Sequence, residues 1–400
     1  MQSAHNKEKV SDLVIFGGSA LFDPPISTSN LVRPSIEVFF KYSKIFHEAK
    51  RYTNDGALIK LLERRLAQFH QVSHCIAYAN GFWALVASIK CIALAERSEV
   101  LMPSLTYRRL ADVVAWAGFK PRFCEVSPEN LAIDPEDVER NISFDTALIL
   151  GVHPIVNTCD APALCQVGQR HGIPVIFDSV ESAYETINGQ KVGNFGKAEC
   201  FSMHASKLLN AFEGGYVTTN DAELAHRLAI LRGFGFFGQD NVEMLGLNAK
   251  LSEIHAAMAL ASLDDLEEQI QRNRARYRIY QNLLADIPGI RLLEFNELEK
   301  TSFKTIVVEL EEPWPLSREV TINLLNTEGA LARAYYYPAL HSKPMVYPFV
   351  PATLPITDAL ADRFILLPCG HMLTESDIEK FVDLLRFIST HASRIKGQMT

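Results

Sequence analysis

The chain has 400 residues, of which 48% are hydrophobic and 22% charged, and its formal net charge is −8. This composition is typical of a folded globular protein long enough for two domains, and it argues against long disordered segments. An acidic balance without clusters of lysine and arginine argues against a surface for nucleic acid or anionic membrane.

The chain shows no sign of a targeting or membrane segment. Its first ten residues are polar, and no stretch approaches the roughly 20 apolar residues of a membrane span. Its seven cysteines lie at irregular spacings and form neither a disulfide framework nor a C-x-x-C metal pattern. We therefore expect a cytoplasmic protein without a bound metal, whose cysteines are small buried residues in a reducing compartment.

The first hundred residues predict an arm, two helices and a strand followed by a glycine turn. Residues 1–30 are polar and rich in proline and serine, which is typical of an extended arm. Helical spacing over residues 36–46 and 57–70 predicts two helices joined by a polar turn. The β-rich run 74–79 then stops at Asn80-Gly81 before another apolar helix. Such a turn is either a plain connector or an anion site, because a helix N-terminus offers free N–H groups.

The next strands alternate with helices. Residues 99–102 form a strand that leads to Tyr107, whose ring would either cover a flat ligand or fill core. Further strands are expected at 120–126 and 146–153, and the apolar run 172–178 ends in Asp178. Apolar strands that alternate with helices indicate a mainly parallel sheet covered on both faces. Ligands of such sheets bind beyond the carboxyl ends of the strands.

The stretch 196–220 predicts a strand, a tight loop and a return strand, with Lys207 in the loop. Alone, a loop lysine is usually solvated and inert. Lysine also forms Schiff bases with carbonyl compounds, because a desolvated amine loses its proton readily. Asp178 falls at the same sheet edge, and a buried carboxylate there needs a partner, such as the pyridinium nitrogen of pyridoxal phosphate. Otherwise Asp178 would cap a helix or join a salt bridge.

The remainder of the chain changes character. A long helix is expected from Glu253 through about Leu284, after which short strands at 291–295, 303–310 and 330–337 mix with helices at 317–327 and from Thr374. We expect a large cofactor-binding domain with the arm in residues 1–250. The connecting helix and a smaller α+β domain would occupy residues 251–400.

Several motifs, in order and over nearly the whole chain, are similar to those of one enzyme family. The motifs that carry this resemblance are Thr53-Asn54-x-Gly56, Asn80-Gly81, Pro103-Ser104-x-Thr106-Tyr107, Gly151-Val152-His153, Asp178, Phe201-Ser202-x-His204-Ala205-Ser206-Lys207, Phe212-Glu213-Gly214-Gly215, Asn248-x-x-x-Ser252-Glu253 and Tyr337-Pro338-x-x-His341. The chain resembles the DegT/DnrJ/StrS family of sugar aminotransferases, which depend on pyridoxal 5'-phosphate and have the aspartate-aminotransferase fold, fold type I. Within the family it looks most similar to enzymes that aminate dTDP-4-keto-6-deoxyglucose at carbon 4.

The resemblance implies a role for each matching residue. Lys207 would bind the cofactor covalently and move the proton, and Asp178 would pair with the pyridine nitrogen. Ser202 and the backbone at Gly81 and Phe82 would hold the phosphate, and Tyr107 would stack on the ring. Residues outside the cofactor pocket are implied as well: Asn248 would reach the neighbouring subunit's cofactor in an obligate homodimer, and Asn54, Tyr337 and His341 would contact the substrate.

Two positions depart from the family's pattern. Phe82-Trp83 replaces the usual small hydroxyl residue after Gly81, which removes a side-chain contact to the phosphate but leaves the backbone donors. Glu181 stands where the family usually has His or Gln beside the cofactor's phenolic oxygen. An unpaired carboxylate would be repelled there, so we expect a raised pKa for Glu181 or an altered charge state of the cofactor ring.

The function expected from the resemblance is transfer of an amino group from L-glutamate to a keto sugar nucleotide. Two alternatives stay open: an aminotransferase for a cyclitol or other natural-product ketone, suggested by Phe82-Trp83 and Glu181, and a non-catalytic sensor that binds pyridoxal phosphate. An intact Asp178 and Lys207 argue against the sensor, since binding alone does not need the lysine.

Overall fold

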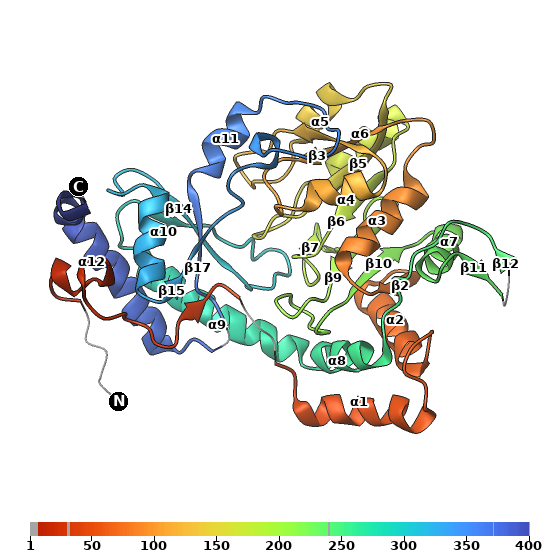
Figure 1. Ribbon diagram of the computed structural model, residues 1–400, viewed down its shortest axis with the longest axis horizontal. Helices are drawn as coiled ribbons and strands as arrows, with labels where there is room; N and C mark the ends of the chain where they lie inside the picture. The colour runs from red at the N-terminus through yellow and green to blue at the C-terminus, as the bar shows by residue number, and fades with distance from the viewer. Residues whose placement is uncertain (1–6, 30–32, 239–240, 371, 400) are drawn as a thin grey trace.

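The computed structural model describes residues 7–29, 33–238, 241–370 and 372–399, and its elements form a larger and a smaller α/β unit (Figure 1). The larger unit is built on a seven-stranded sheet in which β10 alone runs antiparallel to its neighbours. In spatial order its strands are β2 (His74–Tyr78), β10 (Gly215–Thr219), β9 (Ala198–Ser202), β6 (Val175–Asp178), β5 (Thr146–Val152), β3 (Glu99–Pro103) and β4 (Lys120–Cys124). The predicted mainly parallel sheet is confirmed.

Helices cover both faces of this sheet. They are α2 (Ala57–His70), α3 (Gly81–Ile92), α4 (Leu110–Trp116), α5 (Pro135–Asn141), α6 (Ala161–His171) and α7 (Ala222–Arg232). Helix α1 (Ile36–Ala49) packs instead against α2 and α8 (Glu253–Asp264). One apolar core contains Leu85 of α3 and Leu228 of α7, and another contains Val138 of α5 and Leu164 of α6. Because both faces are buried, the central strands β5 and β6 are mainly apolar, and the polar residues at the strand ends are available for a site.

The smaller unit is a four-stranded antiparallel sheet with helices packed on it. Its strands, in spatial order, are β13 (Ile290–Leu292), β14 (Ile306–Leu310), β17 (Phe364–Leu367) and β16 (Arg333–Ala334). The main helices of this unit are α9 (Leu266–Leu284), α10 (Arg318–Thr327) and α12 (Glu375–Met399). Strand β17, which lies inside the sheet, was not anticipated from the sequence.

Short elements complete the chain. They are η1 (Val10–Asp12), η2 (Val14–Phe16), β1 (Ile26–Ser27), the hairpins β7 (Thr186–Ile187) with β8 (Gln190–Lys191) and β11 (Phe236–Phe237) with β12 (Asn241–Val242), β15 (Ala330–Leu331), η3 (Leu340–Ser342) and α11 (Pro355–Ala361). The predicted arm lies partly outside the described residues, at 1–6 and 30. Its described part is not simply extended: Val10 and Leu13 are buried in the core of the smaller unit, and β1 pairs with β15.

The long helix expected through Leu284 is wrong in one respect, since it is two helices. Helix α8 (Glu253–Asp264) ends and α9 begins at Asp265, which has φ −90° and ψ 2°. The Asp265 carboxylate accepts a hydrogen bond from the backbone N–H of Ser35 at 2.8 Å. Aspartate disfavours a helix interior because its carboxylate competes for backbone donors, and here the donor belongs to another segment.

Two further findings concern the cysteines and the search for membrane-spanning helices. All seven cysteines are free thiols, and all except the partly exposed Cys165 are buried. In the part of the chain that the structure describes, no helix is long and apolar enough to cross a membrane.

Candidate active site

The loop between β9 and β10 holds Lys207 in a tight turn. The Lys207 N–H donates to the carbonyl of His204 at 2.8 Å, and the Met203 N–H donates to the carbonyl of Gly214 at 2.8 Å, which extends the hairpin beyond the sheet. The side chain of Lys207 is four-fifths buried. The predicted strand, loop and return strand are confirmed, and the lysine is not a solvated loop residue.

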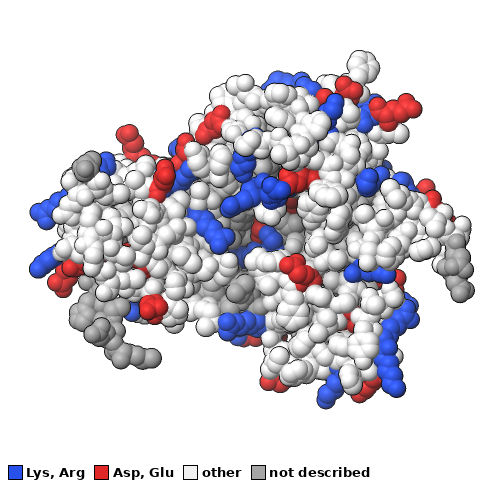
Figure 2. All heavy atoms as spheres, viewed as in Figure 1, with Lys and Arg blue, Asp and Glu red and all other residues white. Residues whose placement is uncertain are grey.

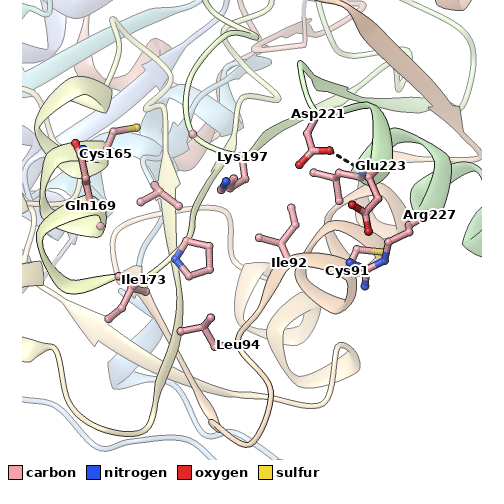
Figure 3. A pocket seen from close by; sticks show the side chains of 16 residues that line it. Cys91, Ile92, Leu94, Cys165, Gln169, Ile173, Lys197, Asp221, Glu223 and Arg227 are labelled. Atoms are coloured by element: carbon pink, nitrogen blue, oxygen red, sulfur yellow. Dashed lines mark hydrogen bonds between the residues drawn. The ribbon is translucent and has the colours of Figure 1, made fainter.

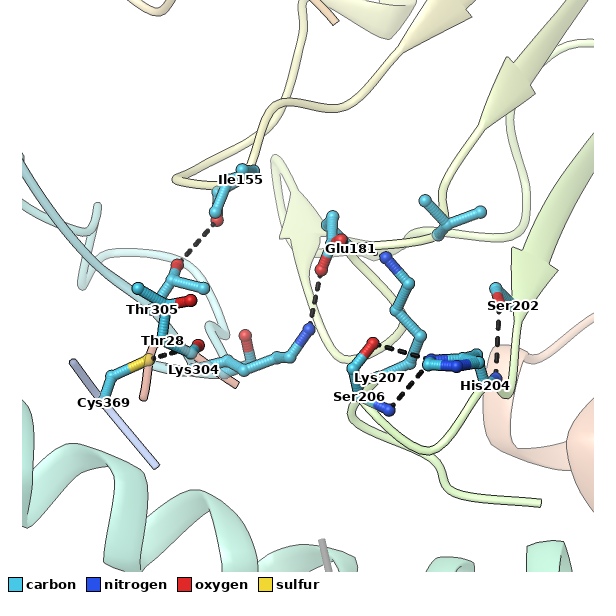
Figure 4. A network of polar contacts seen from close by, with 12 residues as sticks. Thr28, Ile155, Glu181, Ser202, His204, Ser206, Lys207, Lys304, Thr305 and Cys369 are labelled. Carbon is cyan, nitrogen blue, oxygen red and sulfur yellow. Dashed lines mark hydrogen bonds and ion pairs between the residues drawn. The ribbon is translucent and has the colours of Figure 1, made fainter. Parts of the chain in front are cut away.

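Lys207 is paired with Glu181, and Glu181 is paired with a second lysine (Figure 4). One Glu181 oxygen accepts from Lys207 Nζ, and the other accepts from Lys304 Nζ at 2.7 Å. Burial would raise the pKa of the Glu181 carboxyl, but the two ammonium groups outweigh burial and lower the pKa to about 2. The expected rise in this pKa is therefore wrong, because the sequence did not reveal Lys304 as a partner.

The same contact sets the charge of Lys207. Burial lowers the pKa of the Lys207 amine, but the Glu181 carboxylate outweighs burial and raises it. The expectation that desolvation frees the amine of its proton is therefore wrong for the chain without cofactor. A protonated Lys207 must lose a proton before its nitrogen can attack a carbonyl carbon.

Asp178 lies at the carboxyl end of β6, and only 3% of its surface is exposed. Its carboxylate accepts a hydrogen bond from the Val180 N–H at 3.2 Å, and among the described residues no cation forms an ion pair with it. Burial raises the pKa of Asp178 to about 6. A buried carboxylate with so few partners has room for a cationic hydrogen-bond donor.

Gly81 and Phe82 open helix α3 beside Ser202, the last residue of β9. A Cβ at position 81 would lie 3.0 Å from the Cβ of Ser202, so a side chain there would have to push Ser202 or the helix start aside. The Asn80 side chain caps the Trp83 N–H at 2.9 Å. Helix N-terminal N–H groups and a serine hydroxyl thus lie side by side, as binding of a phosphate requires.

Tyr107, Asp178 and Glu181 line one small cavity together with Tyr335 and Tyr336. Tyr107 is half exposed, so its ring is not simply core filling. Tyr335 and Tyr336 were not named from the sequence. Their neighbour Tyr337 was, but its ring faces the guanidinium of Arg318 at 4.1 Å and lines a separate cavity of about 850 Å³.

The remaining candidate residues have no described contact with Lys207. The side chain of His341 is only 5% exposed, and its Nδ1 hydrogen-bonds with the Ser104 hydroxyl at 2.7 Å, so it holds the loop that leads to Tyr107. Asn54 is exposed in a left-handed turn with φ 60°. Asn248 is exposed next to Ala249, whose carbonyl accepts from the Ala79 N–H at 2.7 Å.

The protein has a hollow in the middle of one face (Figure 2) and, elsewhere, a large cavity that lies away from the candidate residues. Figure 2 shows a hollow in the middle of one face, with lysine and arginine at its rim. A cavity of about 760 Å³ lies at the amino ends of β6 and β9 instead, lined by residues such as Pro174, Lys197 and Arg227 (Figure 3). It contains none of the residues named as candidates, and ligands of such sheets bind at the other edge.

The residues at the carboxyl edge fit pyridoxal phosphate. The amine of Lys207 suits its aldehyde, the under-partnered carboxylate of Asp178 suits its pyridine nitrogen, and the α3 N-terminus with Ser202 suits its phosphate.

Comparison with known proteins agrees with this geometry. The dTDP-4-amino-4,6-dideoxy-D-glucose transaminase of Shigella dysenteriae is 28% identical over 92% of this chain and all of its own length. The crystal structure of DesI with its TDP-sugar product superposes with a TM-score of 0.92 at 33% identity, covering 98% of this chain and all of that one. The L-glutamine:2-deoxy-scyllo-inosose aminotransferase of Micromonospora echinospora is 35% identical over 53% of this chain and 54% of its own length.

The family model of the DegT/DnrJ/EryC1/StrS aminotransferases matches residues 37–386. This match and the fold confirm four predictions: fold type I, an enzyme, an aminotransferase of sugar nucleotides, and pyridoxal phosphate as cofactor. The chain belongs to the DegT/DnrJ/EryC1/StrS aminotransferase family.

Proposed function

We propose that this enzyme transfers the amino group of L-glutamate to carbon 4 of dTDP-4-keto-6-deoxyglucose. The observation that carries the proposal is the arrangement of three residues at one edge of the sheet. Asp178 ends β6, Ser202 ends the neighbouring strand β9, and Lys207 lies in the loop that follows β9. The choice of acceptor is supported by the similarity to DesI and to the Shigella transaminase. Each of these similarities extends over more than nine-tenths of this chain.

The residues of this chain divide the work between binding and proton transfer. Bound pyridoxal phosphate supplies an electron sink for the carbon that loses its proton. Asp178 would keep a proton on the pyridine nitrogen, Tyr107 would lie beside the ring, and Ser202 with the N–H groups of Gly81 and Phe82 would hold the phosphate. Lys207 Nζ would bind the cofactor and, as a neutral amine, would take the proton from one carbon and return it to another.

The enzyme works as a homodimer in this proposal, and Asn248 of each subunit completes the site of the other. The support is an exposed apolar surface beside the site. Ile36 and Phe40 of α1 are more than half exposed, and the rings of Phe212, in the Lys207 loop, and Phe39 meet edge to face with their centroids 6.0 Å apart. A contiguous exposed apolar patch next to a functional loop is typical of a subunit interface. The cytoplasmic location stays a prediction from the sequence.

Which ketone is aminated can be tested directly. The purified enzyme is incubated with L-glutamate and a panel of keto sugar nucleotides that vary in nucleotide and in ketone position, and the amino product is identified by mass. We expect amination of dTDP-4-keto-6-deoxyglucose, with the uridine and guanosine analogues slower. Amination of another panel member alone would replace the proposed acceptor.

A cyclitol ketone is the second candidate acceptor. It is favoured by one observation, the 35% identity to an aminotransferase for 2-deoxy-scyllo-inosose, which covers about half of each chain. Including this ketone in the panel, with L-glutamine as well as L-glutamate as donor, separates the two candidates. A non-catalytic sensor would bind the cofactor but would fail to exchange its amino group with either donor.

A further inference from the structure

Lys304 and Lys207 share one carboxylate, Glu181, and come from different parts of the fold. Lys207 lies in the β9–β10 loop of the larger unit, and Lys304 lies just before β14 of the smaller unit (Figure 4). The side chain of Lys304 is 8% exposed and that of Glu181 is 12% exposed. Burial of an ammonium group is costly unless it is paired. The contact is therefore a buried ion pair of the folded protein and not a solvent-exposed ion pair on its surface.

The backbone around Lys304 is fixed from both directions. The Ser302 N–H donates to the Glu185 carboxylate at 3.1 Å, and the Thr305 hydroxyl donates to the carbonyl of Ile155 at 3.2 Å. Both acceptors belong to the larger unit. Lys304 is therefore held against Glu181 before any ligand arrives, which lowers the entropy cost of the contact.

Glu181 has few other neighbours that could take over from Lys304. The titratable groups that line the same small cavity or interact with this cluster are Asp178, Tyr107, His153, Tyr335, Tyr336 and, behind Lys304, Cys369. Of these only His153 can be a cation, and its Nε2 lies 3.5 Å from the carboxylate of Glu199 rather than on Glu181. In the described part of the chain, Lys207 and Lys304 are the cations that form ion pairs with Glu181.

This arrangement bears on the chemistry of Lys207. If Glu181 were paired with Lys207 alone, its full charge would favour the ammonium form of Lys207, which is inactive as a nucleophile and as a base. A second ammonium group on the other oxygen offsets part of that charge. We propose that Lys304 is a positioning residue that shares Glu181 with Lys207 and so lets the Lys207 amine give up its proton. The inference rests on the proposed role of Lys207 in binding the cofactor.

The test measures how fast the cofactor-free enzyme binds pyridoxal phosphate. In this step Lys207 first loses its proton to solvent; its neutral nitrogen then bonds to the aldehyde carbon, and water leaves as the C=N bond forms. The rate is followed by visible absorbance from about pH 7 to 9, well below the pKa of Lys207. In this range the neutral fraction of Lys207, and with it the rate, rises tenfold for each pH unit. Each unit added to this pKa therefore slows the rate tenfold at any one pH.

Four variants separate charge from structure. Lys304→Met removes the shared charge and should slow the rate about tenfold at each pH, since loss of one near charge moves a pKa by roughly one unit. Lys304→Arg should stay within about twofold of the parent. Glu181→Gln should be faster than the parent. Lys300→Met, an exposed lysine of the same segment that lacks the Glu181 contact, is the matched control for general attraction of the phosphate and should also stay within about twofold.

The outcomes are distinct. Equal rates for the parent and Lys304→Met, or an equally slow Lys304→Arg, would overturn the inference. If Lys304→Met does not fold, as judged by circular dichroism, Glu181→Gln still decides, because a slower Glu181→Gln contradicts the proposed sign. Failure of the proposed function looks different: the parent itself would then develop no visible band, or Lys207→Ala would develop the same one.

Discussion

Gly81 and Ser202 lie in direct contact, so that a Cβ at position 81 would come within 3.0 Å of the Ser202 Cβ and 3.2 Å of the Phe201 carbonyl oxygen. This contact joins the start of α3 to the end of β9 and forms the proposed phosphate site. Ser202→Ala removes one hydrogen bond to a charged group, worth about 1.5–3 kcal/mol, so its dissociation constant for pyridoxal phosphate should rise tenfold or more.

Gly81→Ala should weaken cofactor binding to a similar extent, because the new methyl group must push Ser202 or the helix start aside. Both constants are measured by fluorescence titration of the cofactor-free protein. Ser98→Ala, at the opposite edge of the sheet before β3, is the control and should bind as the parent does. An unchanged constant for Ser202→Ala would place the phosphate elsewhere.

Asp178 is predicted to lower the unfolding free energy of the cofactor-free protein while it supports the reaction. Its pKa rises from an ordinary 3.8 to about 6 on folding, so ionisation costs folding energy as the pH rises through this window, and the cost is absent below it. Asp178→Asn should therefore raise the unfolding free energy of the cofactor-free protein at about pH 8 by roughly 2–3 kcal/mol, and should leave it unchanged at about pH 3.5.

The same substitution should slow the reaction with L-glutamate at least a hundredfold, because an amide does not hold a proton on the pyridine nitrogen. Urea unfolding at the two pH values and single-turnover absorbance measure the two effects. A variant that is destabilised at the higher pH, or that reacts at the parent's rate, would contradict the assignment of Asp178.

Glu253 is predicted to matter for folding rather than for catalysis. Its buried carboxylate accepts from the backbone N–H groups of Leu58 at 2.9 Å and Ile59 at 3.2 Å, which caps the start of α2. A Cβ on Gly56 would lie 2.4 Å from the Glu253 carboxyl carbon, so this glycine makes room for the cap. Glu253→Ala should lower the unfolding free energy by about 2–4 kcal/mol, from two lost charge-assisted hydrogen bonds.

The control for this prediction is Glu375→Ala, an exposed residue in the first turn of α12, which should change the unfolding free energy by less than about 0.5 kcal/mol. Both are measured by urea unfolding. A Glu253→Ala variant as stable as this control would show that the cap contributes nothing.

The proposed role of Asn248 across the dimer predicts complementation. Lys207→Ala and Asn248→Ala homodimers should each have little activity, because every site lacks one residue. In a mixed dimer one site combines the intact Lys207 of one subunit with the intact Asn248 of the other. Equal mixing with subunit exchange should restore about a quarter of the parent activity, since half of the dimers are mixed and each has one complete site.

Activity after mixing is measured together with the mass in solution by analytical ultracentrifugation. No recovery from a demonstrably mixed dimer would mean that Asn248 acts within its own subunit or not at all. A monomer that is fully active would refute the shared site.

The sequence predicted the larger unit well because its pattern is simple. Buried parallel strands read as apolar runs, and the turns after them contain glycine or polar residues, so the edge that gathers Gly81, Asp178 and Lys207 followed from the order of the elements. The two-residue strands of the smaller unit and β17 were harder to predict. A run of four apolar residues such as Phe364–Leu367 is equally compatible with helix and strand until its partner strands are known.

The site was predicted only where a local motif marked it. Lys304 lies in an otherwise ordinary strand-like run, and its contact with Glu181 joins residues 123 positions apart, which periodicity does not reveal. The break at Asp265 depends on a donor from Ser35, also distant in sequence. Tyr336 rather than Tyr337 lines the Asp178 cavity, and its backbone is left-handed, with φ 47°, a local conformation that periodicity does not predict.

The central claim is that Lys207 binds pyridoxal phosphate and passes an amino group through it. The most direct measurement is the absorbance spectrum of the purified enzyme with the cofactor, recorded before and after L-glutamate and again after dTDP-4-keto-6-deoxyglucose. We predict a visible band that L-glutamate bleaches and the keto sugar restores, and no such band in Lys207→Ala. An enzyme without this band, or one whose band neither substrate changes, would contradict the account.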